Sequence, residues 1–448
     1  MLSTVHSVVN RHWLFGQTST RLVFLAFVFL SWAALSAFAK DKLNFRDGQT
    51  SQVLRTHDDI RGAAAKMLRR DLNEIPKTIV SVKDFGAVGD GGTDDADAIE
   101  RAARSVANGG IVLFPSGTYL QSRSIKIGAS DVILWGFGAV IYGSNPDDHA
   151  IMMKGDRSSV IGFRLTANQT ERKQATEHHR IVLGGDGNQV VANVVESGAA
   201  GGIYMSGARR FRVADNIVRN TLADGIHATD GSKSGVIANN VVRNTGDDPI
   251  AVVSYRNQRL VSDILITDND IADSPWGRGI AVVGGQNITI ASNVIRNVTH
   301  AAGVYLAREA VYNTYGTSNI IVRKNVIEHV QTRGEVLGGR RRTGHGAIEI
   351  YADDQGNPDL TVQRVLVEEN VVRDALADGV RLNGGVCRIE VIDNKFEKLG
   401  GRVIRTRYHG CAPERVACKG NTLDGSPVAP RECSTFVENI TGAPAQDK

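Results

Sequence analysis

A short motif recurs along this chain at intervals close to 24 residues. Each copy begins with Asn and continues with two residues that are mostly β-branched. The copies are Asn193-Val-Val, Asn216-Ile-Val, Asn240-Val-Val, Asn269-Asp-Ile, Asn293-Val-Ile, Asn325-Val-Ile, Asn370-Val-Val and Asn394-Lys-Phe. A unit of this length with two or three short β-prone runs has no core of its own, so it must stack on its neighbours.

This period predicts an all-β fold, a right-handed parallel β-helix of about ten coils over residues 78–435. Coils stacked about 4.8 Å apart would bury one continuous apolar column. An Asn at the same turn of successive coils tolerates left-handed backbone and can hydrogen-bond to the copies above and below it. The longer steps predict inserted loops, which in solenoids gather on one face, often the binding face. These loops are 253–263, 307–319, 331–345 and 352–363.

The first coil of a solenoid needs a cover, and residues 93–106 are typical of an amphipathic helix. Thr93 is the expected N-cap, and the acidic residues that follow it suit the positive end of a helix. Ala96, Ile99, Ala103 and Val106 form the apolar stripe, and Gly109-Gly110 ends it. We expect this helix to cap the solenoid. Residues 40–77 are predicted to be a charged helical leader, and 436–448 a C-terminal tail.

The N-terminus is typical of an export signal. Arg11 and Arg21 precede an apolar run that ends in Ala37-Phe38-Ala39, a cleavage pattern. We therefore predict a cleaved signal peptide at 1–39, a periplasmic or secreted location and no stable membrane insertion after cleavage. An uncleaved anchor is the alternative, because the run is nearly long enough to span a bilayer.

Charge and cysteine content limit the partners. The net charge of +4 is mild, and no basic run is interleaved with aromatic residues, so no nucleic-acid partner is expected. The protein is expected to be a monomer. All four cysteines lie near the C-terminus, where two disulfides with three alternative pairings are predicted. They are Cys387, Cys411, Cys418 and Cys433.

The segment DFGAVGDGGTDDADAIERA, continued by GGIVLFPSGTY, resembles the N-terminal segment of pectin-lyase-like right-handed β-helix proteins. It is especially similar to that of the polygalacturonase-related glycoside hydrolases of family 28. The resemblance extends over roughly 80–400 and implies the fold. Because hydrolases, lyases and phage tailspikes share this segment, it implies little about chemistry.

Three aspartates lie about one coil apart. Asp224 precedes Asp247 and Asp248 by 23 and 24 residues, so stacking would place their carboxylates roughly 5–9 Å apart. Such a pair can act as the general acid and the base of glycoside hydrolysis, and mutual repulsion would keep one of them protonated. A separation at the long end of that range would predict inversion at the anomeric carbon.

The resemblance assigns roles to these residues. The N-T-D-G and G-D-D-x-I-A segments of polygalacturonase-like enzymes match Leu222–Gly225 and Gly246–Ala251. This implies that Asp248 is the general acid and that Asp224 and Asp247 hold the water. The alternative is ordinary turn chemistry, because LADGV recurs at 376–380 without a following Gly-Asp-Asp.

The rest of the family pattern is not preserved. The coil that should carry G-H-G reads Trp276-Gly-Arg-Gly-Ile-Ala, G-H-G occurs only at 344–346, and the R-x-K motif is missing. His227 joins the aspartates as a catalytic candidate. The substrate-binding candidates are Tyr255, Arg256, Trp276, Arg278, Arg308 and His345. Glu349 and the run Arg340–Arg342 are weaker candidates, and no metal site is predicted.

Three functions remain open. The first is a polysaccharide hydrolase, which needs no cofactor. The second is a uronate-acting lyase or C5-epimerase, for which Ca²⁺ would be a candidate cofactor. The third is a non-catalytic glycan-binding protein. The clustered aspartates favour the hydrolase, with a polysaccharide or oligosaccharide as substrate.

Overall fold

A computed structural model describes residues 56–331, 343–408 and 416–429. The predicted signal peptide, the C-terminal tail, Cys411, Cys433 and Arg340–Arg342 lie outside these residues. Among the residues described, no helix has the length and apolarity that crossing a membrane requires.

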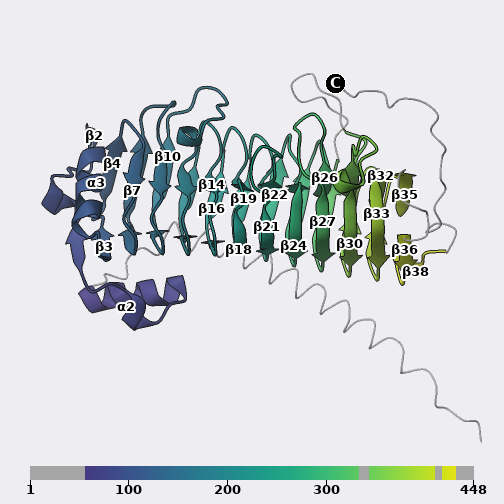
Figure 1. Ribbon diagram of the computed structural model, residues 1–448, viewed down its shortest axis with the longest axis horizontal. Coiled ribbons are helices and arrows are strands. Elements are labelled where there is room, and N and C mark those ends of the chain that lie inside the picture. Colours follow the sequence, from purple (N-terminus) through teal and green to yellow (C-terminus); the bar gives the residue numbers. More distant parts are fainter. Residues whose placement is uncertain (1–55, 332–342, 409–415, 430–448) are drawn as a thin grey trace, which may run out of the picture. The chain divides into compact units, whose positions relative to one another are not determined.

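The described residues form three long sheets, here called A, B and C (Figure 1). Sheet A contains β1 (Ile79–Ser81), β3 (Gly110–Leu113), β6 (Val132–Trp135), β9 (Ser159–Ile161), β12 (Gln189–Val191), β15 (Arg212–Ala214), β18 (Lys233–Ala238), β21 (Ser262–Thr267), β24 (Gly285–Ala291), β27 (Thr317–Arg323), β30 (Val362–Glu368), β33 (Val386–Ile392) and β36 (Val416–Lys419). Sheet B contains β2 (Asp90–Asp94), β4 (Gly117–Gln121), β7 (Ala139–Gly143), β10 (Arg164–Ala167), β13 (Val194–Glu196), β16 (Ile217–Arg219), β19 (Val241–Arg243), β22 (Asp270–Ser274), β25 (Val294–Val298), β28 (Val326–Val330), β31 (Val371–Arg373), β34 (Lys395–Glu397), β37 (Thr422–Leu423) and β38 (Ser426–Pro427). Sheet C contains β5 (Ile125–Ile127), β8 (Ile151–Met153), β11 (Ile181–Leu183), β14 (Ile203–Ser206), β17 (Ile226–Thr229), β20 (Ile250–Val253), β23 (Ile280–Val283), β26 (Val304–Arg308), β29 (Ile348–Ala352), β32 (Val380–Gly384) and β35 (Ile404–Tyr408).

From β3 to β35, each coil contributes one strand to sheet A, one to sheet B and one to sheet C before the chain returns to sheet A. Neighbouring strands are parallel, apart from the final pair β37 and β38, which is antiparallel. This confirms the parallel β-helix. Sheet A has 13 strands, so the solenoid has more coils than the ten expected.

The core is a stack of identical positions from successive coils. The first residue of each middle strand of sheet C pairs in register with the same position on the next coil. These residues are Ile181, Ile203, Ile226, Ile250 and Ile280, and all are fully buried. Because burying a side chain of this size contributes about 1.5–3 kcal/mol, each coil is stabilised mainly by the coils on either side of it.

The repeated asparagines form a buried ladder, as predicted. In Asn293, for example, the side-chain oxygen accepts the backbone N–H of Asn269 at 3.0 Å, and the amide nitrogen donates to Asn325 at 3.0 Å. The expected left-handed backbone is not at the asparagines but one residue earlier, as at Ser292 and Asp268. That residue makes the bend between sheets A and B, and the Asn then fills the space inside the corner.

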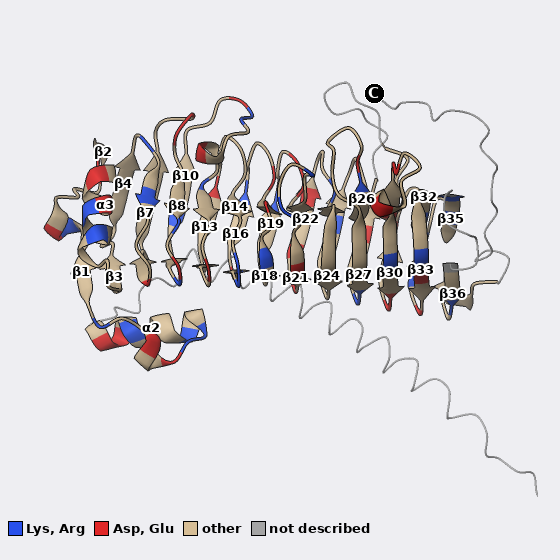
Figure 2. Cartoon of the chain, viewed as in Figure 1, with Lys and Arg blue, Asp and Glu red and all other residues tan. Residues whose placement is uncertain are grey.

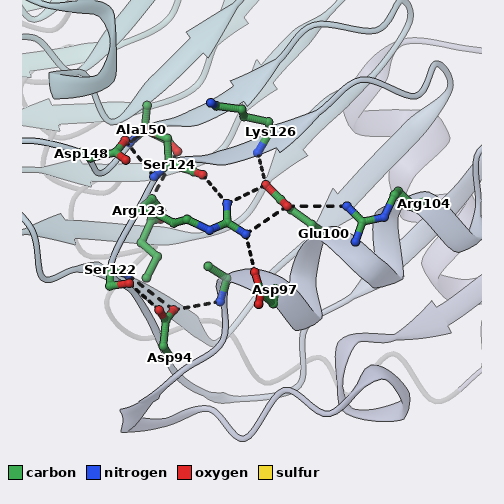
Figure 3. Close-up of polar contacts among 12 residues, drawn as sticks. Asp94, Asp97, Glu100, Arg104, Ser122, Arg123, Ser124, Lys126, Asp148 and Ala150 are labelled. Atoms are coloured by element: carbon green, nitrogen blue, oxygen red, sulfur yellow. Dashed lines mark hydrogen bonds and ion pairs between the residues drawn. The ribbon is translucent and has the colours of Figure 1, made fainter.

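The predicted cap is α3 (Ala96–Ser105), but it begins later than expected. Thr93 belongs to β2, where Asp90 accepts the N–H of Thr93 at 2.7 Å and closes an irregular turn within the strand. Asp95 occupies the N-cap position instead. Figure 3 shows how the helix is attached to the first coils, where Arg123 bridges the carboxylates of Asp97 and Glu100.

The described part of the leader contains α2 (His57–Leu68) and the short helix η1 (Leu72–Glu74). The apolar face of α2 packs on the outward face of sheet A. Ile60, Ala64, Leu68 and Ile75 form one cluster with Ile111, Ile133, Trp135, Ile161 and Val191. Gln189 also donates to the carbonyl of Leu68 at 3.2 Å. The leader is therefore a cover for the first coils of sheet A.

Inserted segments flank sheet C on both sides, and the longer loops lie along the upper edge of Figure 1. Residues 254–261, 309–316 and 353–361 connect sheet C to sheet A and confirm three of the predicted insertions. The segment 168–180 connects sheet B to sheet C and includes η3 (Thr176–His178). Most of the predicted loop 331–345 lies outside the described residues. The other short helices are η2 (Val82–Phe85) and η4 (Pro358–Leu360).

Two further features are the distribution of charged residues and the state of the cysteines. In the view of Figure 2, Lys and Arg positions alternate with Asp and Glu positions along the described coils. Cys387 and Cys418 are both disulfide-bonded. The pairing of the four cysteines stays a prediction, because the other two lie outside the described residues.

Candidate functional site

The site is built on the turn that leads from sheet B into sheet C. Asp224, Asp248 and Arg278 each lie two residues before the first buried residue of a sheet C strand. Because those strands are in register, these three residues form one column along the solenoid. In that column the carboxylate of Asp224 accepts the backbone N–H of Asp248 at 3.0 Å, and Asp248 accepts that of Arg278 at 2.7 Å. Each aspartate therefore ties its own coil to the next.

The same contact occurs outside the trio, at an aspartate that pairs with Arg405 at 2.6 Å. Asp378, in the second LADG segment, accepts the backbone N–H of Arg402 at 2.8 Å. Turn chemistry is therefore part of the role of Asp224 and Asp248. It does not explain Asp247, whose carboxylate instead accepts a hydrogen bond from the Arg172 guanidinium at 2.7 Å.

The structure brings all three aspartates together. One carboxylate oxygen from each of Asp224, Asp247 and Asp248, the aspartate trio, lies within 4.8 Å of the others. They are closer than the 5–9 Å expected, because the Asp224 side chain points along the solenoid to the coil that carries the other two. One water molecule could bridge two oxygens at this distance.

Burial and charge separate the pKa values of the trio. Burial raises the pKa of Asp248 well above its usual range, and the neighbouring aspartates add to this, although Arg278 opposes it. Burial and repulsion from Asp224 also raise the pKa of Asp247. Burial opposes ionisation of Asp224 as well, but its hydrogen bond to His227 and nearby positive charge lower its pKa. Such opposed environments are typical of acid and base pairs.

His227 lies on the outward face of β17, where its Nδ1 is 2.5 Å from the Asp224 carboxylate. A row of rings continues from it along sheet C. Tyr204 precedes it at 5.3 Å between ring centroids, and His179 stacks on Tyr204 at 4.2 Å. Burial lowers the pKa of His179 to about 3, so this ring is neutral. For His227 itself, the contact between Nδ1 and the Asp224 carboxylate fixes the orientation of the ring.

Arg278 connects the trio to the next coils. Its guanidinium lies 3.4 Å from Asp248 and 3.6 Å from Glu309, and it covers the Tyr305 ring at 4.5 Å. The Tyr305 hydroxyl donates to Glu309 at 2.9 Å. On the far side, the His345 ring stacks on Tyr305 at 5.1 Å. Burial lowers the pKa of His345 to about 3, so this ring is neutral. The positive charge on this side of Asp248 therefore comes from Arg278.

The other substrate-binding candidates are more scattered. Tyr255 and Arg256 lie on loop 254–261, where Tyr255 is partly exposed and Arg256 is exposed. Trp276 stacks on His300 at 4.4 Å between centroids. Arg308 is buried at the end of β26 and donates to the carbonyl of Asp353. The binding roles of these four residues stay predictions.

Glu349 is a buried acid on β29. It is 1% exposed, and its carboxylate accepts the backbone N–H of Gly346 at 2.9 Å. Burial raises its pKa to about 8, although Arg381, 3.8 Å away, opposes this. Three coils separate Glu349 from Asp248, a distance that excludes joint action on one glycosidic bond.

Sequence reasoning missed Arg172, Tyr305 and Glu309. Arg172 is 75 residues from Asp247 and reaches it from the segment between β10 and β11. No repeat relates these positions, so spacing gave no signal. Tyr305 could have been found, because it falls in the same outward column of sheet C as His227.

The fold and the site together define a class of protein. It is a parallel β-helix protein with a cluster of acidic residues at one edge of sheet C. Residues 79–303 match the family profile described as rhamnogalacturonase A/epimerase, pectate lyase-like, and the chain belongs to this family. That family includes proteins that act on polysaccharides.

Individual proteins are similar over different shares of their length. The chain is 44% identical over 236 residues to the pre-neck appendage protein of Bacillus phage B103, which is 52% of this chain and 24% of the phage protein. The chain spans about a quarter or less of the length of the curated relatives it matches.

Two solved structures share the fold. The mannuronan C-5 epimerase AlgE6 A-module of Azotobacter vinelandii superposes with a TM-score of 0.57 at 19% identity, over 77% of this chain and 98% of that one. The catalytic unit of the GH87 α-1,3-glucanase of Streptomyces thermodiastaticus gives a TM-score of 0.57 at 20% identity, over 81% of this chain and 71% of that one. At these identities the likeness is one of fold.

Proposed function

We propose that this protein is an exported glycoside hydrolase that acts on a polysaccharide. The observation that carries the proposal is the aspartate trio, in which three carboxylates of opposed pKa meet at one edge of sheet C. Asp248, whose raised pKa favours its protonated form, would donate a proton to the leaving oxygen. Asp224 and Asp247 would hold and activate the attacking water.

The counter-charges of the trio support chemistry without a metal. Arg172 lies against Asp247 and Arg278 against Asp248, so two guanidinium groups already offset the carboxylates. A cation at the trio would have to compete with both. If the protein is a hydrolase of this kind, removal of divalent ions with a chelator leaves its activity unchanged.

A second candidate is a uronate-acting lyase or epimerase, favoured by the contact between His227 and Asp224. A histidine held through Nδ1 by a carboxylate is oriented to act as a base through its other nitrogen. In that case Asp247 and Asp248 would bind the substrate or Ca²⁺.

The first test incubates the purified protein with neutral and acidic polysaccharides and follows reducing ends and the ultraviolet absorbance of unsaturated uronate together. Reducing ends alone indicate hydrolysis, and both signals together indicate β-elimination. A change in uronate stereochemistry without either signal indicates epimerisation. If all three are absent, a binding function replaces catalysis.

The second test uses Asp248→Asn. An Asn side chain keeps the oxygen that accepts the Arg278 N–H, so the fold should persist while proton donation is lost. We expect activity to fall at least about 1,000-fold. Asp378→Asn is the matched control, because it makes the same backbone contact outside the trio. Full activity in Asp248→Asn with native circular dichroism would refute the assignment.

A further inference from the structure

The loop that follows β26 exposes two apolar side chains side by side. Val311 is 85% exposed and Tyr312 is 62% exposed, the highest values among the exposed large apolar side chains of the described residues. An apolar side chain that stays exposed adds no burial free energy to folding. Neighbouring exposed apolar side chains are typical of contact surfaces. A tyrosine also combines an apolar face with a polar hydroxyl, which suits a ligand with both kinds of surface.

The loop is held in place by its own hydrogen bonds. The backbone N–H of Glu309 donates to the Thr314 hydroxyl at 2.9 Å, and the Thr314 N–H donates back to the carbonyl of Glu309 at 3.2 Å. The Asn313 N–H closes the turn on Ala310 at 2.9 Å. These hydrogen bonds order the backbone of the loop, and an ordered backbone reduces the entropy cost of binding.

A second loop braces the first. Tyr255 and Thr314 form an antiparallel bridge between loops 254–261 and 309–316. The Arg256 N–H donates to the carbonyl of Asn313 at 2.9 Å. These contacts join two insertions that start from coils two apart, and we refer to them as the loop pair.

The loop pair adjoins the aspartate trio. At its root, Glu309 contacts Arg278, which contacts Asp248. Burial raises the pKa of Tyr255, and the charges of Asp224, Glu309 and Tyr312 add to this rise, so Tyr255 lies near both the trio and the tip of the loop. A chain-like ligand with one unit at the trio would therefore meet the tip of the loop with a neighbouring unit.

We propose that Val311 and Tyr312 form a sugar-binding platform for a polysaccharide that extends from the trio over the loop pair. The C–H face of a pyranose ring would pack on the Tyr312 ring, and Arg256 would offer hydrogen bonds to the oxygens of the same chain. The position of the reacting sugar rests on the proposed function, whereas binding at the platform can be measured without turnover.

The test is affinity electrophoresis of the full-length protein in gels that contain polygalacturonate, alginate, dextran or α-1,3-glucan in soluble carboxymethylated form. Asp248→Asn is the background, so that no polymer is consumed. We expect at least one polymer to retard this protein and Tyr312→Ala to raise the apparent Kd about 3- to 10-fold. Tyr312→Phe, which keeps the ring, should stay within about 2-fold of the background.

Leu72→Ala is the matched control, because Leu72 is another exposed apolar residue (49%) but lies on η1, away from sheet C. The proposal is overturned if Tyr312→Ala binds as tightly as Leu72→Ala, if Tyr312→Phe is as weak as Tyr312→Ala, or if no polymer retards the protein. Tyr312-dependent binding without reducing ends from the wild type would refute the hydrolase and keep the platform. Hydrolysis by the wild type together with binding that does not depend on Tyr312 would refute the platform and keep the hydrolase.

Discussion

Asp224 and Asp248 each serve the backbone and the site at once. One carboxylate oxygen of each accepts an N–H from the next coil, and the second oxygen of Asp224 contacts Nδ1 of His227. Asp378 shows that the same backbone contact is made outside the trio. What distinguishes the site at this scale is Asp247, which adds a third carboxylate without taking part in the column.

The pH dependence of activity should reflect the arginine beside each acid. Arg278 opposes the rise in the pKa of Asp248, so Arg278→Gln should raise that pKa further. Because a general acid acts while protonated, activity would then be lost at higher pH. We expect the basic limb of the kcat/KM profile to move up by about 1 pH unit or more.

Arg172→Gln is the control for this prediction. Arg172 lowers the pKa of Asp247, which must be ionised to act as base, so its loss should chiefly move the acidic limb to higher pH. A basic limb that moves down in Arg278→Gln, or moves equally in both variants, would contradict the assignment of Asp248 as the acid.

At the scale of the element, the asparagine ladder fixes the corner between sheets A and B in every coil it crosses. The ladder side chains are buried, and each hydrogen-bonds to backbone groups at the bend. The Asn293 side chain, for example, accepts the N–H of Asn269 and donates to the carbonyl of Ile266. The left-handed residue before each Asn has no common side chain, as Ala192, Asp215, Ser292 and Lys324 show. The bend is therefore specified by the Asn and the space around it.

Removing one ladder side chain should be costly. In Asn293→Ala, the backbone N–H of Asn269 and the carbonyl of Ile266 lose buried partners, so we expect a loss of about 2–4 kcal/mol in the free energy of unfolding. Urea titration measures it. Asn287→Gly is the control, since Asn287 hydrogen-bonds to Asp263 at the surface and glycine keeps its left-handed backbone. Equal losses in both variants would show that burial of the ladder contributes little.

At the scale of the whole described unit, the three sheets have different roles. Sheet A carries the leader helix on its outward face, and sheet C carries the candidate site between inserted segments. Stability and function are thus separated on different sides of one core. Local damage on sheet A should spare activity.

Leu68→Asp tests that separation. Leu68, the last residue of α2, is 1% exposed, so a carboxylate there should displace the helix and expose the apolar face of sheet A. We expect a lower Tm and stronger binding of a hydrophobic dye, but near-native kcat/KM at low temperature. Lys66→Gln, an exposed change on the same helix, is the control. Loss of kcat/KM in folded Leu68→Asp would mean that the leader supports the site.

The sequence by itself determined the repeated part of this protein. Because each coil must stack on an equivalent coil, the spacing of the asparagines specified the solenoid, and the interval between Asp224 and Asp247-Asp248 placed them on adjacent coils. The tertiary structure decided what the repeat does not encode. Arg172 and Glu309 reach the trio from inserted segments whose lengths vary, and the pairing of Tyr255 with Thr314 joins two of these insertions. Such contacts depend on the path of each loop over its neighbours, and this path has no period.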